Sequence, residues 1–389
     1  MRIAFVELSG QGGLAHHAFQ LCRGLAHAGA KVTLITRDDY ELAMLCAPFR
    51  IEQTARISAP RARPTTLRGI TRRVRYLQEW LRIVRRLEEL RPDAVFLNQI
   101  HLTADYFPLL GVRRHAPLLA HIVRDPWDGS AADTRKRFYA LFDILFTHEE
   151  SSRAAICREY AVAEERTMTI PRGNGEIFSE LADPTFTPGA LRKQLGLGDE
   201  VPVILYFGKL APHKGVDLLL HAFARVHERT GAALVIAGRP QSGFDVNAHV
   251  ALAQEHGFGN RVVWVADSIP AEHVVAWMQL ASVVALPDRE PCHNGALAIA
   301  QTYGAPIVAS DLPSTRDVVE DGVSGLLAPA GDQDAWSDAL CRLLDDRPLA
   351  QRLGAQCAAI ARTRASWDGI GHTILERLRA RSTEQRRRA

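Results

Sequence analysis

The chain has 389 residues, a length that favours two domains over one. Apolar residues make up 47% and charged residues 23%, which excludes a disordered chain, and no apolar run approaches the roughly 20 residues of a membrane span. The net charge is only +3, but residues 50–91 hold twelve Arg and four Glu and residues 376–389 hold six Arg and two Glu, so we expect an anionic partner or surface.

The first half of the chain has the pattern of a doubly wound α/β domain. An apolar strand at 3–6 runs into the glycine-rich turn SGQGG, and a helix at 14–28 and a strand at 31–36 follow. Strand, turn, helix and strand in this order form a βαβ unit, which requires a parallel sheet. Further strands are expected at 94–97, 118–123 and 144–147.

A long basic helix is expected at 67–90. Its apolar residues recur every three or four positions, as one helix face requires, and arginines lie on the other side. One interpretation is a surface helix that packs its apolar face on the sheet; the alternative is contact with anionic lipid near a lipid-linked acceptor. No nucleic-acid-binding motif accompanies the charge, so we expect no nucleic acid partner. The apolar positions are Leu67, Ile70, Val74, Leu77, Leu81, Val84 and Leu87, and the arginines are Arg68, Arg72, Arg75, Arg82 and Arg86.

The second half repeats the pattern from residue 201 on. The strand VPVILYFG leads into the loop GKLAPHKG and an amphipathic helix, so the sequence predicts a second doubly wound α/β domain. The segment 182–196, which contains Pro184, Pro188 and Gly189, is the best linker candidate, and the expected domains are 1–181 and 197–365. Further strands are expected at 233–237, 262–265, 283–286 and 307–309.

The cysteines and the N-terminus indicate the compartment. The six cysteines are scattered and form no C-x-x-C pair, which argues against a zinc site or disulfide framework and fits a reducing cytosol. The segment MRIAFVEL has too short an apolar stretch for a signal peptide. We therefore expect a cytoplasmic protein, with peripheral contact at the inner membrane face in the lipid-binding interpretation.

The glycine loop Gly10–Gly13 leaves a strand and enters a helix. Glycines there let a ligand approach N–H groups at a helix N-terminus, which suits a phosphate or carboxylate. The loop also fits the loose dinucleotide pattern G-x-G-x-x-A up to Ala15, with Asp38 or Asp39 available for a ribose. Tight turns use glycine for packing alone, so this pattern leaves both readings open.

Two further loops follow predicted strands at the edge where open α/β sheets bind ligands. In GKLAPHKG, Lys209 and Lys214 could neutralise a diphosphate leaving group, unless both are solvated surface lysines. In the second loop, Glu290 could accept hydrogen bonds from sugar hydroxyls, and Gly295 opens a helix whose N-terminus could bind phosphate. The plainer interpretation makes Asn294 a helix cap and Glu290 a first-turn carboxylate.

Five segments, in order along nearly the whole chain, resemble the glycosyltransferases of family 4. They are GGLAHHAFQLCRGLAHAGAKVTLIT, YFGKLAPHKGVDLLLHAFA, LVIAGR, the 286–310 segment with its GAPIVAS, and EDGVSGLLAPAGD. The resemblance implies the GT-B fold, an α/β fold with two Rossmann-like doubly wound domains that face each other across a cleft. It also implies retaining transfer from a UDP- or GDP-sugar without a metal ion or other cofactor. SWDGIGHTILERL resembles the family's closing helix, so residues 366–389 are expected to cross back to the N-terminal domain.

The resemblance carries roles over to individual residues. Lys209 and Lys214 would contact the donor diphosphate, and Glu290 would contact the donor sugar as the first of two glutamates spaced eight apart. The only D-x-D, Asp332–Asp334, falls in the family's PAGD segment and is expected to cap a helix. The residues expected to line the donor site are Gly12, Gly13, Gly208, Gly238, Asn294 and Gly295.

The sequence departs from the family at three positions. The second glutamate, which usually binds the donor ribose, is replaced by Ala298 or Ile299, depending on the alignment. In the segment IVRDPWD, Arg124 stands in place of the family histidine near the anomeric carbon and is followed by Asp125. The histidine expected after strand 94–97 is replaced by Asn98, with His101 three residues further on. Arg124 cannot act as a base but could bind an acceptor carboxylate or phosphate, whereas Asp125 or His101 could guide the acceptor proton. A turn role for Asp125 and a structural role for His101 are the alternatives.

We therefore expect a retaining glycosyltransferase that acts on a hydroxyl acceptor of glycan, glycolipid or natural-product type. The lost glutamate and the replaced histidine keep a second hypothesis open, a catalytically silent protein of this fold that binds nucleotide or acts as a scaffold. An NAD-dependent oxidoreductase would rest on the Gly10–Ala15 pattern and would leave GKLAPHKG unexplained. A nucleotide-sugar epimerase of the same fold is a further alternative.

Overall fold

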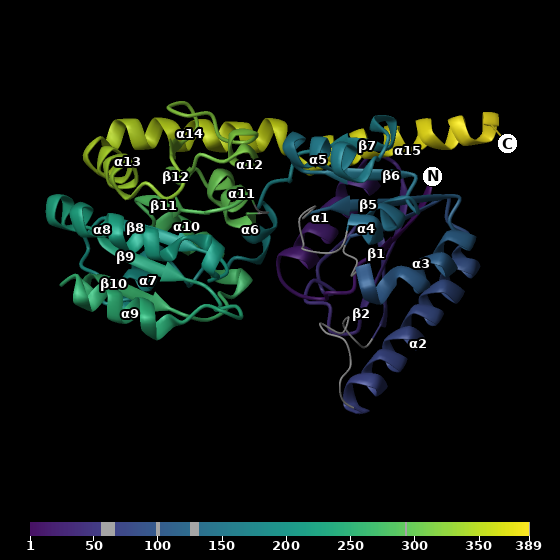
Figure 1. Cartoon of the computed structure of the whole chain (residues 1–389), viewed down its shortest axis with the longest axis horizontal. Coiled ribbons are helices and arrows are strands. Elements are labelled where there is room, and N and C mark those ends of the chain that lie inside the picture. Colours follow the sequence, from purple (N-terminus) through teal and green to yellow (C-terminus); the bar gives the residue numbers. More distant parts are fainter. Residues whose placement is uncertain (56–66, 99–101, 125–131, 292–293, 389) are drawn as a thin grey trace. The chain divides into compact units, whose positions relative to one another are not determined.

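A computed structural model describes residues 1–55, 67–98, 102–124, 132–291 and 294–388 (Figure 1). The chain divides into two units: the first comprises Met1–Gly173 with Ser366–Ala389, and the second comprises Asn174–Ala365. The C-terminal helix α15 (Trp367–Arg388) thus belongs to the first unit, where it packs along α1 (Gly13–His27), as the family resemblance implied.

The boundary between the units lies earlier than the expected one at residue 181. Residues 174–181 and the expected linker 182–196 both belong to the second unit. The reason is a set of contacts that sequence alone does not reveal: the N–H of Gly175 donates to Oγ1 of Thr302 at 2.7 Å, which ties this segment to a helix of the second unit.

The proline and glycine that suggested a linker begin a helix instead. Pro188 takes the first position of α7 (Pro188–Gln194), where its missing N–H is not needed, and Oγ1 of Thr187 caps the helix. Leu191 on this helix is buried in the core of the second unit, so the segment is a packed part of that domain.

The sheet of the first unit has, within the described residues, seven parallel strands in the order β3-β2-β1-β4-β5-β6-β7. Strands β4 and β5 are buried along their whole length, as a parallel sheet covered by helices requires. The strand order reverses between β1 and β4, and ligands of such folds bind at the carboxyl ends beside this reversal. The strands are β1 (Arg2–Val6), β2 (Lys31–Arg37), β3 (Arg50–Ala55), β4 (Ala94–Leu97), β5 (Leu118–Val123), β6 (Ile144–Thr147) and β7 (Thr167–Thr169), and the remaining helices are α2 (Leu67–Leu90), α3 (Leu102–His115), α4 (Ala132–Tyr139) and α5 (Glu150–Tyr160).

The second unit is built in the same way around a second parallel sheet, which has six strands in the described chain. Their order is β10-β9-β8-β11-β12-β13, so this sheet reverses between β8 and β11. The strands are β8 (Val203–Phe207), β9 (Ala233–Ala237), β10 (Val262–Val265), β11 (Val283–Leu286), β12 (Ile307–Ser310) and β13 (Leu326–Ala328). The remaining helices are α6 (Ile177–Leu181), α8 (Val216–Thr230), α9 (Val246–Glu255), α10 (Val274–Leu280), α11 (Gly295–Thr302), α12 (Pro313–Arg316), α13 (Gln333–Asp345) and α14 (Arg347–Arg364), with 3-10 turns η2 (Pro212–Lys214), η3 (Gly259–Arg261) and η4 (Ala271–His273). The 3-10 turn η1 (Glu164–Arg166) belongs to the first unit.

Helix α2 forms where expected, but it packs through a different face. Tyr76 and Trp80 are buried together with Ile83 and Leu87, because the aromatic side chains offer more apolar area to the core than the expected aliphatic stripe. In the expected stripe, Val74, Leu77 and Leu81 are 49%, 39% and 58% exposed, so this part of the predicted packing face is wrong.

Candidate active site

The two loops singled out in the second half of the sequence meet where the second sheet reverses. β8 and β11 are far apart in the sequence but are neighbours in the sheet. Residues 208–215 follow β8, and residues 287–291 follow β11. Because adjacent parallel strands end at the same edge, the tertiary structure brings both loops to the edge at which open α/β sheets bind ligands.

A buried carboxylate holds Lys214 at this edge. Nζ of Lys214 lies 2.9 Å from Oδ1 of Asp288, and the two side chains are only 12% and 9% exposed. Oδ2 of Asp288 accepts a hydrogen bond of 2.6 Å from Nδ2 of Asn294. Asn294 in turn caps α11 by accepting the N–H of Leu297 at 3.3 Å. One carboxylate therefore fixes both the predicted phosphate-binding lysine and the N-terminus of α11.

Further contacts tie the two loops to each other. The N–H of Arg289 donates to the carbonyl oxygen of His213 at 2.8 Å, and its guanidinium donates to Oδ2 of Asp217 at 2.5 Å. Gly215 has φ +64, and a Cβ on it would lie 2.0 Å from the carbonyl oxygen of Pro287. Only glycine allows this approach, so the two loops form one connected platform.

The other predicted donor-site residues of the second unit lie at the same edge. Lys209 and Glu290 are exposed, and neither side chain forms an ion pair or hydrogen bond with the residues that the structure describes. Gly295 is the exposed first residue of α11, and Gly208 and Gly238 directly follow β8 and β9. The structure thus links Lys214 and Asn294 through Asp288, and it places Lys209 and Glu290 beside this network without contact to it.

Asp288 is the residue that the sequence interpretation overlooked. It is 6% exposed, although it lies only two positions beyond the end of β11. A carboxylate just past an apolar strand, with lysines in another strand-end loop, is the sequence signal that could have found it, because a buried charge needs a partner.

In the first unit, carboxylates organise the glycine loop after β1. Glu7 is fully buried and accepts two N–H groups of the loop, including that of Gly10 at 3.0 Å. Oε1 of Glu41 accepts the N–H of Gly12 at 2.6 Å. Gly12 is the N-cap of α1 and Gly13 its first residue. The Gly12 N–H that we expected near the donor diphosphate is therefore bonded to a carboxylate of the chain in this structure.

Arg124 follows β5 and lies in a polar cluster near this loop. Its guanidinium donates to Oδ1 of Asn98 at 2.8 Å, and Nδ2 of Asn98 donates to the carbonyl oxygen of Leu14 at 3.0 Å. Burial lowers the pKa of Arg124 to about 10, so the side chain keeps its charge at pH 7. Burial also lowers the pKa of His17 and of His148 well below its ordinary value, which keeps both imidazoles neutral.

The same cluster holds an ion pair that sequence reasoning missed. Glu149, directly after β6 and His148, pairs with Arg172, and both side chains are buried. The charges of Arg172 and Glu149 act on the pKa of Arg124 in opposite directions, so the three groups are electrostatically coupled.

The remaining candidates are placed as follows. His101 and Asp125 lie outside the described residues. Asp332 caps α13 by accepting the N–H groups of Asp334 and Ala335 at 3.1 and 3.0 Å, which confirms the predicted cap.

In the described ranges, no group of three or more His, Cys, Asp or Glu side chains could hold a metal ion. None of the described helices has both the length and the apolar character to cross a membrane.

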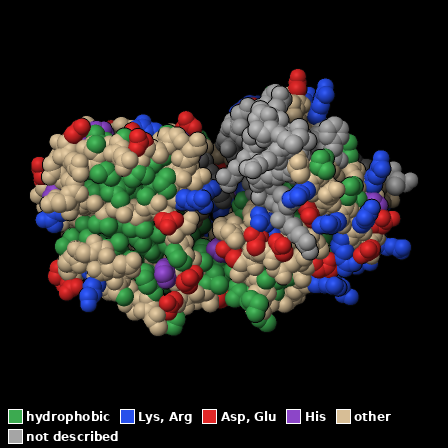
Figure 2. Space-filling view, turned by 90° about the horizontal axis from the view of Figure 1, so that it is seen from below, with side chains coloured by type: hydrophobic (Ala, Val, Ile, Leu, Met, Phe, Trp, Pro, Cys, Tyr) green, Lys and Arg blue, Asp and Glu red, His purple; other side chains and the backbone are tan. Residues whose placement is uncertain are grey.

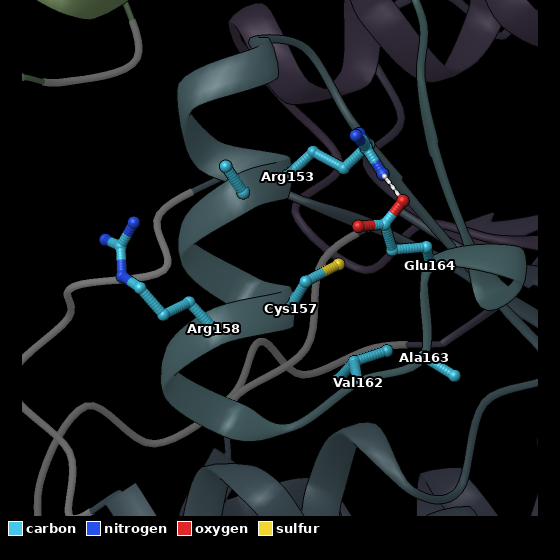
Figure 3. A pocket seen from close by; sticks show the side chains of 7 residues that line it. Arg153, Cys157, Arg158, Val162, Ala163 and Glu164 are labelled. Carbon is cyan, nitrogen blue, oxygen red and sulfur yellow. Dashed lines mark ion pairs between the residues drawn. The ribbon is translucent and has the colours of Figure 1, made fainter.

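A cavity of about 430 Å³ lies on α5, and none of the candidate site residues described above lines it (Figure 3). Its lining includes Arg153, Cys157 and Arg158, and Arg153 already forms ion pairs with Glu150 and Glu164. The cavity brings together none of the residues that the sequence analysis selected, so the candidate site remains the edge between β8 and β11.

Comparison with protein families gives two matches. Residues 11–173 match the model described as Glycosyltransferase Family 4, and residues 201–346 match the model described as Glycosyl transferases group 1. The chain is also similar to the D-inositol 3-phosphate glycosyltransferases of Xylanimonas cellulosilytica and Nocardia farcinica. Both are 30% identical, over 258 and 250 residues, which make up 64% and 62% of this chain. The matches span 59% and 53% of the lengths of these relatives.

Solved structures with the same fold cover nearly the whole chain. The crystal structure of Anabaena HepE in complex with UDP has a TM-score of 0.74 at 19% identity and covers 98% of this chain and 100% of that one. Sucrose-phosphate synthase from Thermosynechococcus elongatus also has a TM-score of 0.74 at 19% identity, with 98% of each chain covered. The fold is therefore GT-B, as the sequence predicted. The two family models match successive segments that together make up most of the chain, so a Glycosyltransferase Family 4 domain is followed by a Glycosyl transferases group 1 domain.

Proposed function

We propose that the chain is a retaining glycosyltransferase that moves a sugar from a nucleotide-diphosphate donor to an acceptor hydroxyl. The ion pair between Lys214 and Asp288 carries this proposal, since it holds a cation and the N-terminus of α11 at the ligand-binding edge of the second sheet. The two family matches support the same reaction. Crystal structures of HepE are complexes with UDP and with UDP-glucose, which favours a UDP-sugar donor for this chain, with a GDP-sugar as the second donor to test.

In the proposed reaction, the bond between the anomeric carbon and the diphosphate oxygen breaks, and a bond to the acceptor oxygen forms on the same face of the sugar. Lys209, Lys214 and the N–H groups at the start of α11 stabilise the negative charge that develops on the diphosphate. The acceptor proton passes to the departing phosphate oxygen, so the reaction requires no strong protein base. These cations replace a metal ion, and turnover is expected to continue in EDTA.

The first unit offers a place for the acceptor at Arg124. Its guanidinium is charged, partly exposed and oriented by Asn98, which suits a phosphate or carboxylate on the acceptor. The curated relatives are named for D-inositol 3-phosphate, a compound that carries such a phosphate. Arg124→Gln should therefore raise the KM for an anionic acceptor and leave the KM for the donor unchanged.

Turnover tests the proposed reaction directly. Nucleotide release is measured with UDP- and GDP-sugars over a panel of hydroxyl acceptors, for the wild type and for Lys214→Ala. Loss of turnover in Lys214→Ala is expected, whereas Lys193→Ala, which removes an exposed lysine on α7, should behave like the wild type. Full activity of Lys214→Ala would show that the phosphate-binding role assigned to Lys214 is wrong.

A catalytically silent nucleotide-binding protein is the second candidate. It is favoured by α11, where Ala298 or Ile299, depending on the alignment, stands in place of the family's ribose-binding glutamate. Calorimetry distinguishes the two functions, because tight nucleotide binding without turnover over the whole donor and acceptor panel would support the silent protein.

We further propose that the first unit contacts an anionic membrane through α2. Val74, Leu77 and Leu81 follow one another at helical spacing, so their exposed side chains form an apolar stripe on one face. The exposed Arg75 lies next to this stripe, and Arg82, which is 57% exposed, is paired with Glu79. Figure 2 shows further Lys and Arg side chains gathered at the right-hand edge of the view, where Figure 1 draws α2, α3 and the end of α15.

An apolar stripe flanked by arginines matches a lipid surface, because the stripe enters the acyl boundary while each arginine contributes about 1 kcal/mol near anionic headgroups. Sedimentation with phosphatidylglycerol-containing vesicles tests this contact, with pure phosphatidylcholine vesicles for comparison. Leu77→Gln/Leu81→Gln should abolish binding, and Val323→Gln, at a 40% exposed position in the second unit, should not. Equal binding by all three proteins would exclude α2 as the contact.

A further inference from the structure

The chain segments that follow the neighbouring strands β8 and β9 continue side by side beyond the end of the second sheet. β8 and β9 pair in parallel up to Phe207 and Ala237, and pairing returns as a bridge between Leu210 and Pro240. The offset between the paired residues is the same at both places. Lys209 and Arg239 are therefore opposite one another, with backbones about 5 Å apart, the usual spacing of neighbouring strands.

A pair of glycines fixes this arrangement. Gly208 and Gly238 precede the two cations and have φ of +136 and +154, a region that other residues rarely adopt. A Cβ on Gly238 would lie 1.6 Å from the carbonyl oxygen of Gly208. The N–H of Leu210 then donates to the carbonyl oxygen of Arg239 at 3.1 Å, which holds the two chains together beyond the glycines.

The charges at this edge are compensated unequally. Lys214 is paired with buried Asp288, and Arg289 is paired with Asp217. Lys209 and Arg239 are both exposed, and neither forms an ion pair with the residues that the structure describes. An anion bound between two adjacent like charges offsets their repulsion, so this pair offers positive charge to an anionic ligand.

We propose that Arg239 is a further donor-binding residue, which together with Lys209 binds the phosphates of a nucleoside diphosphate. The inference rests on the proposed function for the class of ligand, and it adds a residue to which neither the motifs nor the family resemblance gave a role. A guanidinium binds two phosphate oxygens at once, whereas the adjacent ammonium acts as a point charge. Lys214, held by Asp288, completes the set from the other side of β8.

Calorimetric titration with UDP and with GDP tests the role of Arg239. For whichever diphosphate the wild type binds, Arg239→Gln should raise the Kd tenfold or more, the size expected for loss of hydrogen bonds to a charged group. Arg239→Lys should recover part of the affinity, because it keeps the charge but not the two-pronged geometry. Arg225→Gln is the matched control, since Arg225 on α8 is paired with Asp334 and Asp338 and should bind like the wild type.

The outcomes separate this inference from the proposed function. A Kd for Arg239→Gln within tenfold of the wild type, with unchanged donor KM, would overturn the role of Arg239 while leaving sugar transfer intact. A large loss of diphosphate binding in a protein that turns over no donor would support Arg239 and count against the transferase. Failure of the wild type to bind either diphosphate would overturn both. Because Arg239 is exposed, the melting temperature of ligand-free Arg239→Gln should match that of the wild type, and a lowered one would mark a structural role instead.

Discussion

Replacement of Asp288 by alanine should destabilise the second unit strongly. The Asp288 side chain is 9% exposed, and its carboxylate lies 2.9 Å from the Lys214 ammonium and accepts a second hydrogen bond from Asn294. Removing one partner of a buried ion pair destabilises by about 3–5 kcal/mol, because the other charge stays away from water without its counter-ion. The Lys214 side chain is 12% exposed and can gain some hydration, so we expect the lower end, about 3 kcal/mol.

Thermal unfolding by scanning calorimetry measures this effect. For a domain of this size, 1 kcal/mol corresponds to a shift in melting temperature of about 2–4 °C, so Asp288→Ala should lower it by roughly 6–12 °C. Asp217→Ala is the matched control at the same edge, because the Arg289–Asp217 pair is 42% and 41% exposed. An exposed pair contributes less than about 1 kcal/mol.

A double-mutant cycle isolates the interaction itself. Lys214→Met and Asp288→Ala are each measured alone and together, and the double variant should lose much less than the sum of the two single variants. Additive losses, or an Asp288→Ala melting temperature equal to that of Asp217→Ala, would refute the claim that this buried pair holds the platform together.

Two other predictions concern stability. Gly238→Ala should destabilise the protein by about 3 kcal/mol or more in urea unfolding, because the new Cβ would clash with the Gly208 carbonyl oxygen. Gly257→Ala is the control: Gly257 has φ +78 and open space around it, so the substitution should cost only about 1–2 kcal/mol. Equal losses of stability in the two variants would contradict the clash at Gly238. Burial lowers the pKa of His121 from 6.5 to about 4, so the unfolded chain takes up its proton first as the pH falls, and stability should decrease between pH 6.5 and 4 by roughly 3 kcal/mol from this group. His121→Gln should flatten that dependence, and an unchanged slope would show that His121 does not produce it.

Much of the fold could be predicted because the relevant signals are local. The strands at 94–97, 118–123 and 144–147 form at the predicted residues, since short apolar runs bounded by turn residues have few alternatives in a parallel sheet. The strand–glycine–helix order likewise predicted that Lys214 and Asn294 would follow strand ends. Their meeting through Asp288 could not be predicted, because it depends on β8 and β11 being neighbours in the sheet.

The sequence alone determined the two doubly wound domains, the glycine turns at the strand ends and the kind of chemistry that the loops can perform, because backbone sterics and hydrophobic periodicity act over a few residues. The tertiary structure decided which face of α2 is buried, where the units divide, and that Asp288 compensates the charge of Lys214, whereas Lys209 and Arg239 form no ion pair with any residue that the structure describes. Those outcomes depend on burial and on charges brought together from distant parts of the chain, and their energies exist only once the sheets have formed.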